Sequence, residues 1–114
     1  MAKPAAPDFH QIESLGEDIK RYVLSILGND LYPPDPFRYY SGLAYAIRER
    51  LIKMWLATQA SYYDSMSKRV YYLSMEFLPG RFLMNYITNM GMEDGCRQAA
   101  ADLGFNLDDL AEEE

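Results

Sequence analysis

The residues best suited to chemistry are a carboxylate and a cation at the two ends of a short loop, Glu76 and Arg81. Glu76 directly follows a mainly apolar run over 70–75, and Arg81 follows the breaker pair Pro79-Gly80. In open α/β sheets, ligands bind beyond the carboxyl ends of the strands, so a carboxylate there can hold ligand hydroxyls or tune a neighbouring charge. The alternative is a purely structural ion pair of Glu76 with Arg81 or Lys68, and the pattern leaves both readings open.

The residues needed for disulfides, metal sites, phosphate-binding loops or acid–base catalysis are missing from the sequence pattern. Cys96 is the only cysteine and His10 the only histidine, so the chain can form neither an internal disulfide nor a Cys-based zinc site. Cys96 is expected to be a small buried hydrophobe. The glycines are too dispersed for a phosphate-binding loop, and the acidic run Glu112–Glu114 is typical of a solvated helix face. We therefore expect no metal site and no catalytic residue in this segment.

The composition narrows the class of protein. Apolar residues make up 49% of the 114, which excludes an intrinsically disordered chain. The net charge is −6 and no run of Lys or Arg exceeds two, so neither nucleic acid nor an anionic membrane surface is an expected partner. No run approaches the roughly 18 apolar residues of a membrane span, and the start has no apolar signal region. These features predict a cytoplasmic protein.

The first half of the chain predicts a flexible arm over 1–10, a helix over 11–28, an extended connector over 29–35 and a long helix over 36–62. Gly28-Asn29 can end the first helix, since both residues tolerate positive φ. Asp35-Pro36 is a strong start for the second, with Asp as the cap and Pro at the first helical position. Its apolar stripe is expected to comprise Tyr40, Leu43, Ala44, Ile47, Leu51, Met54 and Trp55, and its solvated face Arg48, Glu49, Arg50 and Lys53.

The second half predicts one strand followed by helices. Residues 69–75 are short, apolar and β-prone, which is typical of a strand buried on both faces, and helices are expected over 79–114. The expected fold is therefore mostly α with one buried β-strand. A lone buried strand leaves its N–H and C=O groups unpaired, so we expect the missing strands in the rest of a longer polypeptide or in another chain.

One long block resembles a known family. Residues 68–81 read KRVYYLSMEFLPGR, which closely resembles the K-R-[IV]-Y-Y-L-S-[LM]-E-F-x-x-G-R motif of the α-glucan phosphorylases, the glycogen, starch and maltodextrin enzymes. The resemblance covers about residues 30–114. It includes, upstream, Tyr39 to Ala44, Arg48, Trp55, Thr58-Gln59 and Tyr62-Tyr63, and downstream Asn85, Asn89, Gly91, Glu93, Cys96, Ala99, Leu103-Gly104 and Asp109-Leu110.

The resemblance implies that residues 11–114 are an incomplete N-terminal domain of a larger glycosyltransferase with two Rossmann-like domains (GT-B type). Family enzymes release glucose 1-phosphate from α-1,4-glucan with phosphate, and they use pyridoxal phosphate held by a lysine that this chain lacks. By resemblance, Glu76 lines the active cleft in a supporting role and Arg81 holds a neighbouring glycine-rich loop. The chain alone is expected to bind no cofactor and to be inactive.

The resemblance also bears on regulation and assembly. Nucleotide-activated members stack a base on a tyrosine that matches Tyr63, but the arginines that hold the phosphate are replaced here by Met54 and Ala57. We therefore expect an unregulated member. The connector 29–35 matches the segment through which the family forms homodimers.

Two alternatives remain. The chain could be a non-enzymatic, truncated protein that acts as an interaction stub and pairs its apolar strand with another chain. A related two-domain enzyme of the glycogen synthase type is a weaker alternative, because the Tyr71-to-Phe77 block argues against it.

Overall fold

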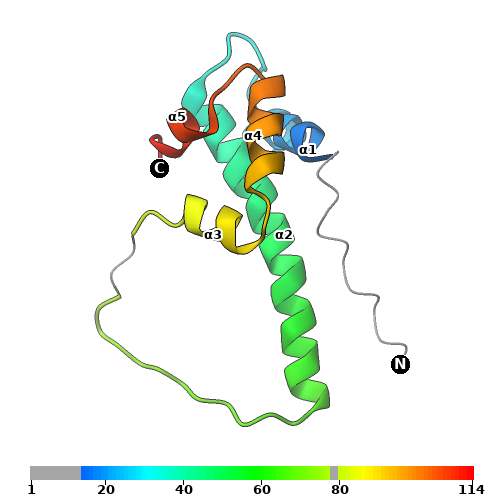
Figure 1. Cartoon of the computed structure of the whole chain (residues 1–114), viewed down its shortest axis with the longest axis vertical. Helices are drawn as coiled ribbons and strands as arrows, with labels where there is room; N and C mark the ends of the chain where they lie inside the picture. The colour runs from blue at the N-terminus through cyan, green and yellow to red at the C-terminus, as the bar shows by residue number, and fades with distance from the viewer. Residues whose placement is uncertain (1–13, 78–79) are drawn as a thin grey trace.

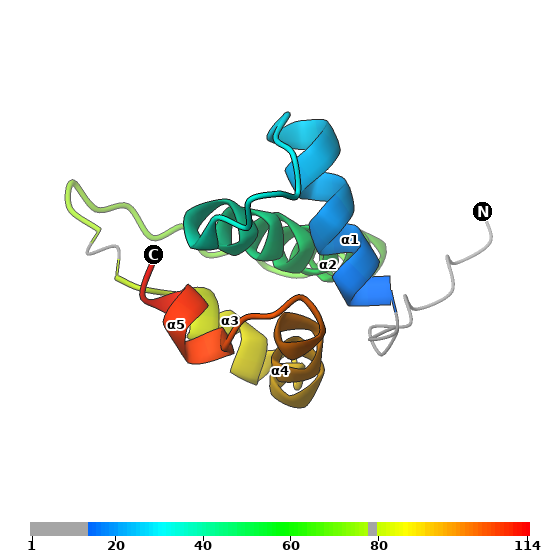
Figure 2. The ribbon, with the colours of Figure 1, turned by 90° about the horizontal axis from the view of Figure 1, so that it is seen from above.

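The computed structural model describes residues 14–77 and 80–114, and the expected arm over 1–10 lies outside these ranges. The elements are α1 (Leu15–Arg21), a π-helical turn η2 (Tyr22–Ile26), α2 (Pro36–Asp64), α3 (Leu83–Asn89), α4 (Glu93–Asp102) and α5 (Leu107–Ala111), as Figure 1 shows. The long α2 runs through the molecule. Figure 2 shows α1 crossing it on one side and α3, α4 and α5 gathered on the other.

Local chemistry explains where the first helix runs and stops. Glu17 and Asp18 lie in the first turn of α1 and Lys20 and Arg21 in its last, which suits the helix dipole. In η2 the Leu27 N–H donates to the Tyr22 carbonyl at 3.0 Å. The chain then turns away at Gly28, whose φ of +63° is in the left-handed region, as the sequence predicted.

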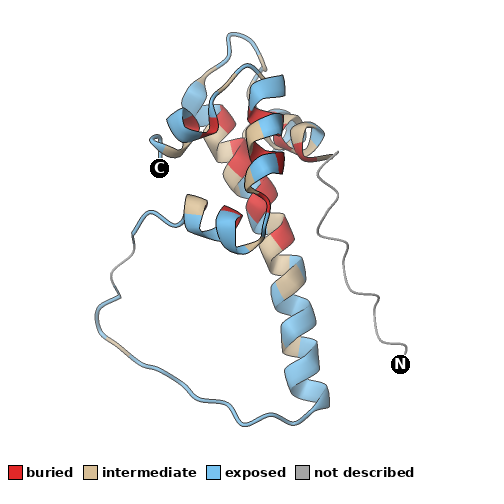
Figure 3. Ribbon diagram, viewed as in Figure 1, coloured by how far each residue is buried: buried red, intermediate tan, exposed pale blue. Residues whose placement is uncertain are grey.

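Helix α2 begins as its sequence predicts, but only its first half is covered. The Asp35 carboxylate accepts from the Phe37 N–H at 3.1 Å, and Pro36 occupies the first turn. Beyond Arg50 no residue of α2 is buried, and Figure 3 shows this half projecting from the bundle. The prediction that Trp55 belongs to the core is wrong for this chain, because its side chain is 56% exposed with no helix packed over it.

The core lies where α1, α4 and α5 meet the first half of α2. Its fully buried large side chains are Leu15, Ile19, Val23, Leu43, Ile47, Ile87, Met92, Cys96 and Leu107. The rings of Tyr39 and Phe105, with centroids 4.7 Å apart, join α2 to the turn before α5. The crossing of α1 over α2 is close because residue 42 is glycine. A Cβ there would lie 2.9 Å from Val23 Cγ2 and 3.0 Å from the Ile19 carbonyl oxygen.

The buried strand expected over 69–75 is not formed. No strand occurs among residues 14–77 and 80–114, and residues 67–77 run as an extended loop. Val70 is 87% exposed and Leu73 90%. A strand needs neighbours for its N–H and C=O groups, and the described chain supplies none, so these groups face solvent instead. The fold as it stands is a small helical bundle with one long exposed connection.

Candidate functional site

Glu76 lies on the exposed extended connection. Its backbone is fixed locally, because the Ser74 hydroxyl donates to the Glu76 carbonyl at 2.6 Å and accepts from the Glu76 N–H at 3.1 Å. The carboxylate itself points to no ion-pair partner among the described residues. A negative charge is therefore available to a ligand, on a segment that no other element supports.

Arg81 is engaged elsewhere. Its guanidinium pairs with the Glu112 carboxylate at 3.1 Å, across the gap between the start of α3 and the end of α5. The structural ion pair of Glu76 with Arg81 or Lys68, left open above, is thus absent from the described residues. The structure ties Arg81 to the C-terminal acidic run and leaves Glu76 apart from it.

Tyr63 lies at the far end of α2, next to an open cleft. Its ring is 75% exposed, and the Arg69 guanidinium lies over it at 5.0 Å from the ring centroid. The cleft has a volume of about 440 Å³ and is lined by Gln59, Tyr62, Ser67, Lys68, Arg69, Val70 and Tyr71. Met54 and Ala57, on the same helix, supply no charge.

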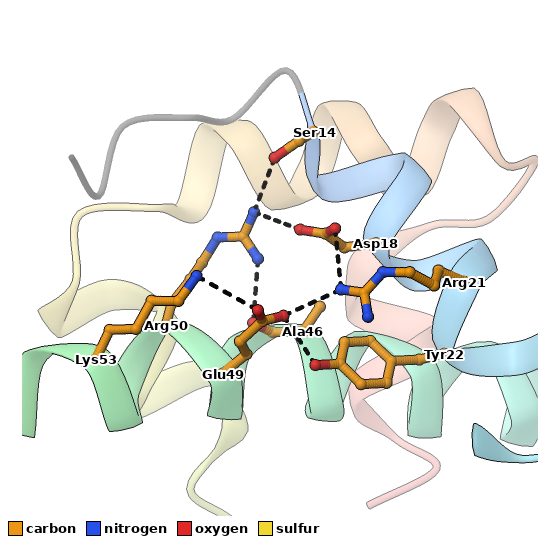
Figure 4. Close-up of polar contacts among 8 residues, drawn as sticks. All are labelled: Ser14, Asp18, Arg21, Tyr22, Ala46, Glu49, Arg50 and Lys53. Carbon is orange, nitrogen blue, oxygen red and sulfur yellow. Dashed lines mark hydrogen bonds and ion pairs between the residues drawn. The ribbon is translucent and has the colours of Figure 1, made fainter. Parts of the chain in front are cut away.

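A polar cluster between α1 and α2 was missed by the sequence analysis (Figure 4). Arg50, expected on the solvated face, is only 8% exposed. Its guanidinium donates to the Asp18 carboxylate at 3.0 Å, to the Ala46 carbonyl at 3.1 Å and to the Ser14 hydroxyl at 3.4 Å. A buried guanidinium needs such partners, because an uncompensated charge in the interior is costly.

Glu49 is the second centre of this cluster. Its carboxylate accepts from the Tyr22 hydroxyl at 2.8 Å and pairs with Arg21 at 3.2 Å and Lys53 at 3.3 Å. The hydrogen bond from Tyr22, helped by the two cations, lowers the pKa of Glu49. Arg21 in turn contacts Asp18 at 3.2 Å. Opposite charges are paired throughout, so the cluster fastens α1 to α2 and presents no proton acceptor for catalysis.

The sequence did contain a signal for Arg50. Leu43, Ala46, Ile47 and Arg50 are spaced i, i+3, i+4 and i+7, which puts the arginine on the buried stripe. A charged residue on that stripe predicts a partner on the facing helix, and Asp18 is that partner.

The described residues offer no other accessible reactive group that we could identify as a nucleophile or a metal site. Burial raises the pKa of the Cys96 thiol to about 11, so it is not a ready nucleophile. In the described ranges, no three His, Cys, Asp or Glu side chains come together as metal ligands. Nor is any helix there long and apolar enough to cross a membrane.

Comparisons with known proteins supply what the geometry does not. No protein-family model matches the sequence. Over 101 residues, 89% of the chain, it is 37% identical to sheep muscle glycogen phosphorylase, 45% to the human liver form and 36% to the bovine liver form. The chain spans about 12% of the length of these relatives. The resemblance to the phosphorylases is thereby confirmed, over a short part of the length of these relatives.

Proposed function

We propose that this chain is a segment of an α-glucan phosphorylase, a glycosyltransferase that releases glucose 1-phosphate from α-1,4-glucan and phosphate in the cytoplasm. The similarity to glycogen phosphorylases, which extends over 89% of the chain, carries this proposal. The segment would lie in the N-terminal domain of a GT-B type enzyme. It would contribute structure and one cleft-lining acid, and the reaction itself would take place on residues outside it.

Glu76 is the acid that we assign to the active cleft of the full-length enzyme, which is distinct from the open cleft at the end of α2. Its carboxylate has no ion-pair partner among the described residues, so it can accept hydrogen bonds from glucan hydroxyls. Such bonds would orient the sugar and shape the local charge, which is a supporting contribution. Glu76 precedes Arg81 by five residues, and the Arg81 guanidinium pairs with Glu112 at 3.1 Å and not with Glu76.

The cofactor of the full enzyme would be pyridoxal phosphate, and the described lysines do not fit it. A Schiff-base lysine needs a desolvated pocket that favours the neutral amine. Lys20 is paired with Glu17 at 3.3 Å and Lys53 with Glu49 at 3.3 Å, both at the surface. Lys68 lines the open cleft at the end of α2. We therefore assign the cofactor lysine to a part of the enzyme outside the described residues.

The enzyme is proposed to lack nucleotide activation. Met54 and Ala57 cannot bind a phosphate group, and Arg69 already covers one face of the Tyr63 ring. Micromolar AMP should leave the rate of the full-length enzyme unchanged in a glucose 1-phosphate assay. Saturable activation that is lost in Tyr63→Ala would refute the proposal.

Homodimerisation through the connector 29–35 is the assembly that we propose. Tyr32, in the middle of this connector, exposes most of its ring, which leaves an aromatic surface for a second subunit. The full-length enzyme should run as a dimer in light scattering, and Tyr32→Ser should shift it toward monomer at micromolar concentrations.

The central experiment compares two purified proteins. One is the full-length product of the gene, reconstituted with pyridoxal phosphate, and the other is the 114-residue chain. With maltodextrin and phosphate, the full-length protein should release glucose 1-phosphate and the short chain should release none. No activity from the full-length protein, or activity from the short chain alone, contradicts the proposal. Sequencing the gene past Glu114 provides a parallel check, since the frame should continue into a glycine-rich loop and a cofactor lysine.

One observation favours a second function, a non-enzymatic interaction stub. The apolar side chains of 70–77 are exposed together on one extended segment, which could pair with strands of another protein. Translation of a stable 114-residue product that ends in its own stop codon would support this function over the first.

A further inference from the structure

Helix α3 begins without a cap of its own. Its N-cap residue is Phe82, whose side chain has no hydrogen-bond acceptor. The first N–H groups of any helix have no partner inside the helix, so they need an acceptor from elsewhere. At this helix the acceptor comes from a residue more than thirty positions later in the chain.

Glu114 supplies that acceptor. One carboxylate oxygen, Oε1, accepts from the Phe82 N–H at 2.9 Å and from the Leu83 N–H at 3.2 Å, and Oε2 lies 3.4 Å from the Leu83 nitrogen. The negative charge also suits the positive end of the helix. Tyr40 of α2 is close enough for burial and the Glu114 charge to raise its pKa.

Glu112, two residues before Glu114, adds a second link. Its carboxylate pairs with Arg81, the residue before the N-cap, at 3.1 Å. Alternate residues of the acidic run thus contact consecutive residues, Arg81 to Leu83, at the start of α3. Glu113, between them, has no side-chain hydrogen bond or ion pair to the described residues.

We propose that Glu112 and Glu114 form a clamp that fixes the end of α5 to the start of α3. The clamp holds Arg81 and the start of α3 relative to the point at which the chain leaves α5. Glu112 and Glu114 are then positioning residues for Arg81, which the resemblance places near the substrate. This consequence for activity rests on the proposed function, whereas the clamp itself does not.

Amide hydrogen exchange in the 114-residue chain tests the clamp directly. Glu114→Ala should make the Phe82 and Leu83 amides exchange about tenfold faster, since a lost cap exposes both N–H groups. Glu113→Ala removes an equal negative charge at the adjacent residue and should change these exchange rates less than about twofold. Equal exchange in the two variants, or unchanged exchange in Glu114→Ala, overturns the clamp. Circular dichroism checks that both variants keep their helices.

The positioning role is tested in the full-length enzyme with its cofactor bound. Glu114→Ala should lower kcat/KM for maltodextrin about tenfold while the bound pyridoxal phosphate, read by its absorbance, stays the same, and Glu113→Ala should leave both unchanged. Faster exchange at Leu83 with unchanged kcat/KM overturns the positioning role. Because exchange is measured without glucan or cofactor, failure of the clamp and failure of the proposed function are separate results.

Discussion

Gly42 shows how one missing side chain decides the approach of two helices. An added methyl group would lie 2.9 Å from Val23 Cγ2 and 3.0 Å from the Ile19 carbonyl oxygen, so α1 would have to move. Gly42→Ala should therefore destabilise the fold by about 1–2 kcal/mol, an overpacking cost reduced by the better helix propensity of alanine. Urea unfolding measures the change.

Gly16 is the matched control for this substitution. It also lies in a helix, α1, but nothing is within 4 Å of its would-be Cβ. Gly16→Ala should stabilise the fold by up to about 1 kcal/mol through helix propensity alone. Opposite signs for the two substitutions support close packing at Gly42, and two stabilising changes would contradict it.

Tyr22 and Glu49 yield a prediction about pH. The hydrogen bond from Tyr22 is the main cause of the lowered pKa of Glu49, so Tyr22→Phe should raise that pKa toward its ordinary value of 4.5. The bond favours the ionised carboxylate in the folded state. Its stabilisation is present above pH 4.5 and is lost as the pH falls through the folded-state pKa. Carbon-13 NMR titration of the Glu49 carboxyl measures the shift.

The control for the pH prediction is Tyr45→Phe. The Tyr45 ring stacks on Tyr22 with centroids 5.6 Å apart, but Glu49 takes its hydrogen bond from Tyr22. The pKa of Glu49 should stay unchanged in this variant. Equal shifts in both variants would mean that the pKa of Glu49 responds to the loss of either hydroxyl, and not to the Tyr22 hydrogen bond in particular.

At the same scale, residues with a local role were predictable and residues with a distant partner were not. The cap at Asp35 and the positive φ of Gly28 follow from the chemistry of a few neighbouring residues. Arg50 was assigned to the solvated face although its spacing from Leu43 and Ile47 puts it on the buried stripe, and its partner Asp18 is thirty-two positions away. A helical pattern gives the direction of a side chain but does not identify the element that covers it.

At the scale of elements, α2 combines a supporting half with an uncovered half. Ile47 is 2% exposed in the core cluster, so Ile47→Ala should cost about 2–4 kcal/mol through lost contacts and a cavity. Leu56 lies on the projecting half and is largely exposed, so Leu56→Ala should change stability by less than about 0.5 kcal/mol. Urea unfolding measures both. A large loss of unfolding free energy in Leu56→Ala would contradict the exposure of the second half of α2 and indicate that another surface packs on it.

The uncovered half explains why the core prediction failed where it did. Tyr40, Leu43 and Ile47 contact other helices, while Trp55 continues the same apolar stripe into solvent. The apolar periodicity of α2 was identified correctly. The periodicity does not show how far the neighbouring helices extend, and they end before they reach Trp55.

At the scale of the whole molecule, the mostly helical class was predicted correctly and the strand over 69–75 wrongly, for a single physical reason. Helical hydrogen bonds close within the segment, so caps and periodicity suffice to place α2. Strand hydrogen bonds need a neighbour, and residues 69–75 have none among the described residues. The apolar side chains of this segment, which suggested burial, are exposed to solvent in the structure.

This difference yields a prediction that compares the chain with the full-length enzyme. Leu73 is 90% exposed, so Leu73→Lys should change the unfolding free energy of the 114-residue chain by less than about 0.5 kcal/mol. In the full-length enzyme, a sheet that buried Leu73 would have to bury the charge, and the yield of soluble, active protein should collapse. Ser67→Lys adds the same charge before the apolar run and should be tolerated in both proteins. A full-length Leu73→Lys enzyme that folds normally would mean that this segment stays at the surface. Its apolar side chains would then be a docking site for another protein, which is the second function proposed above.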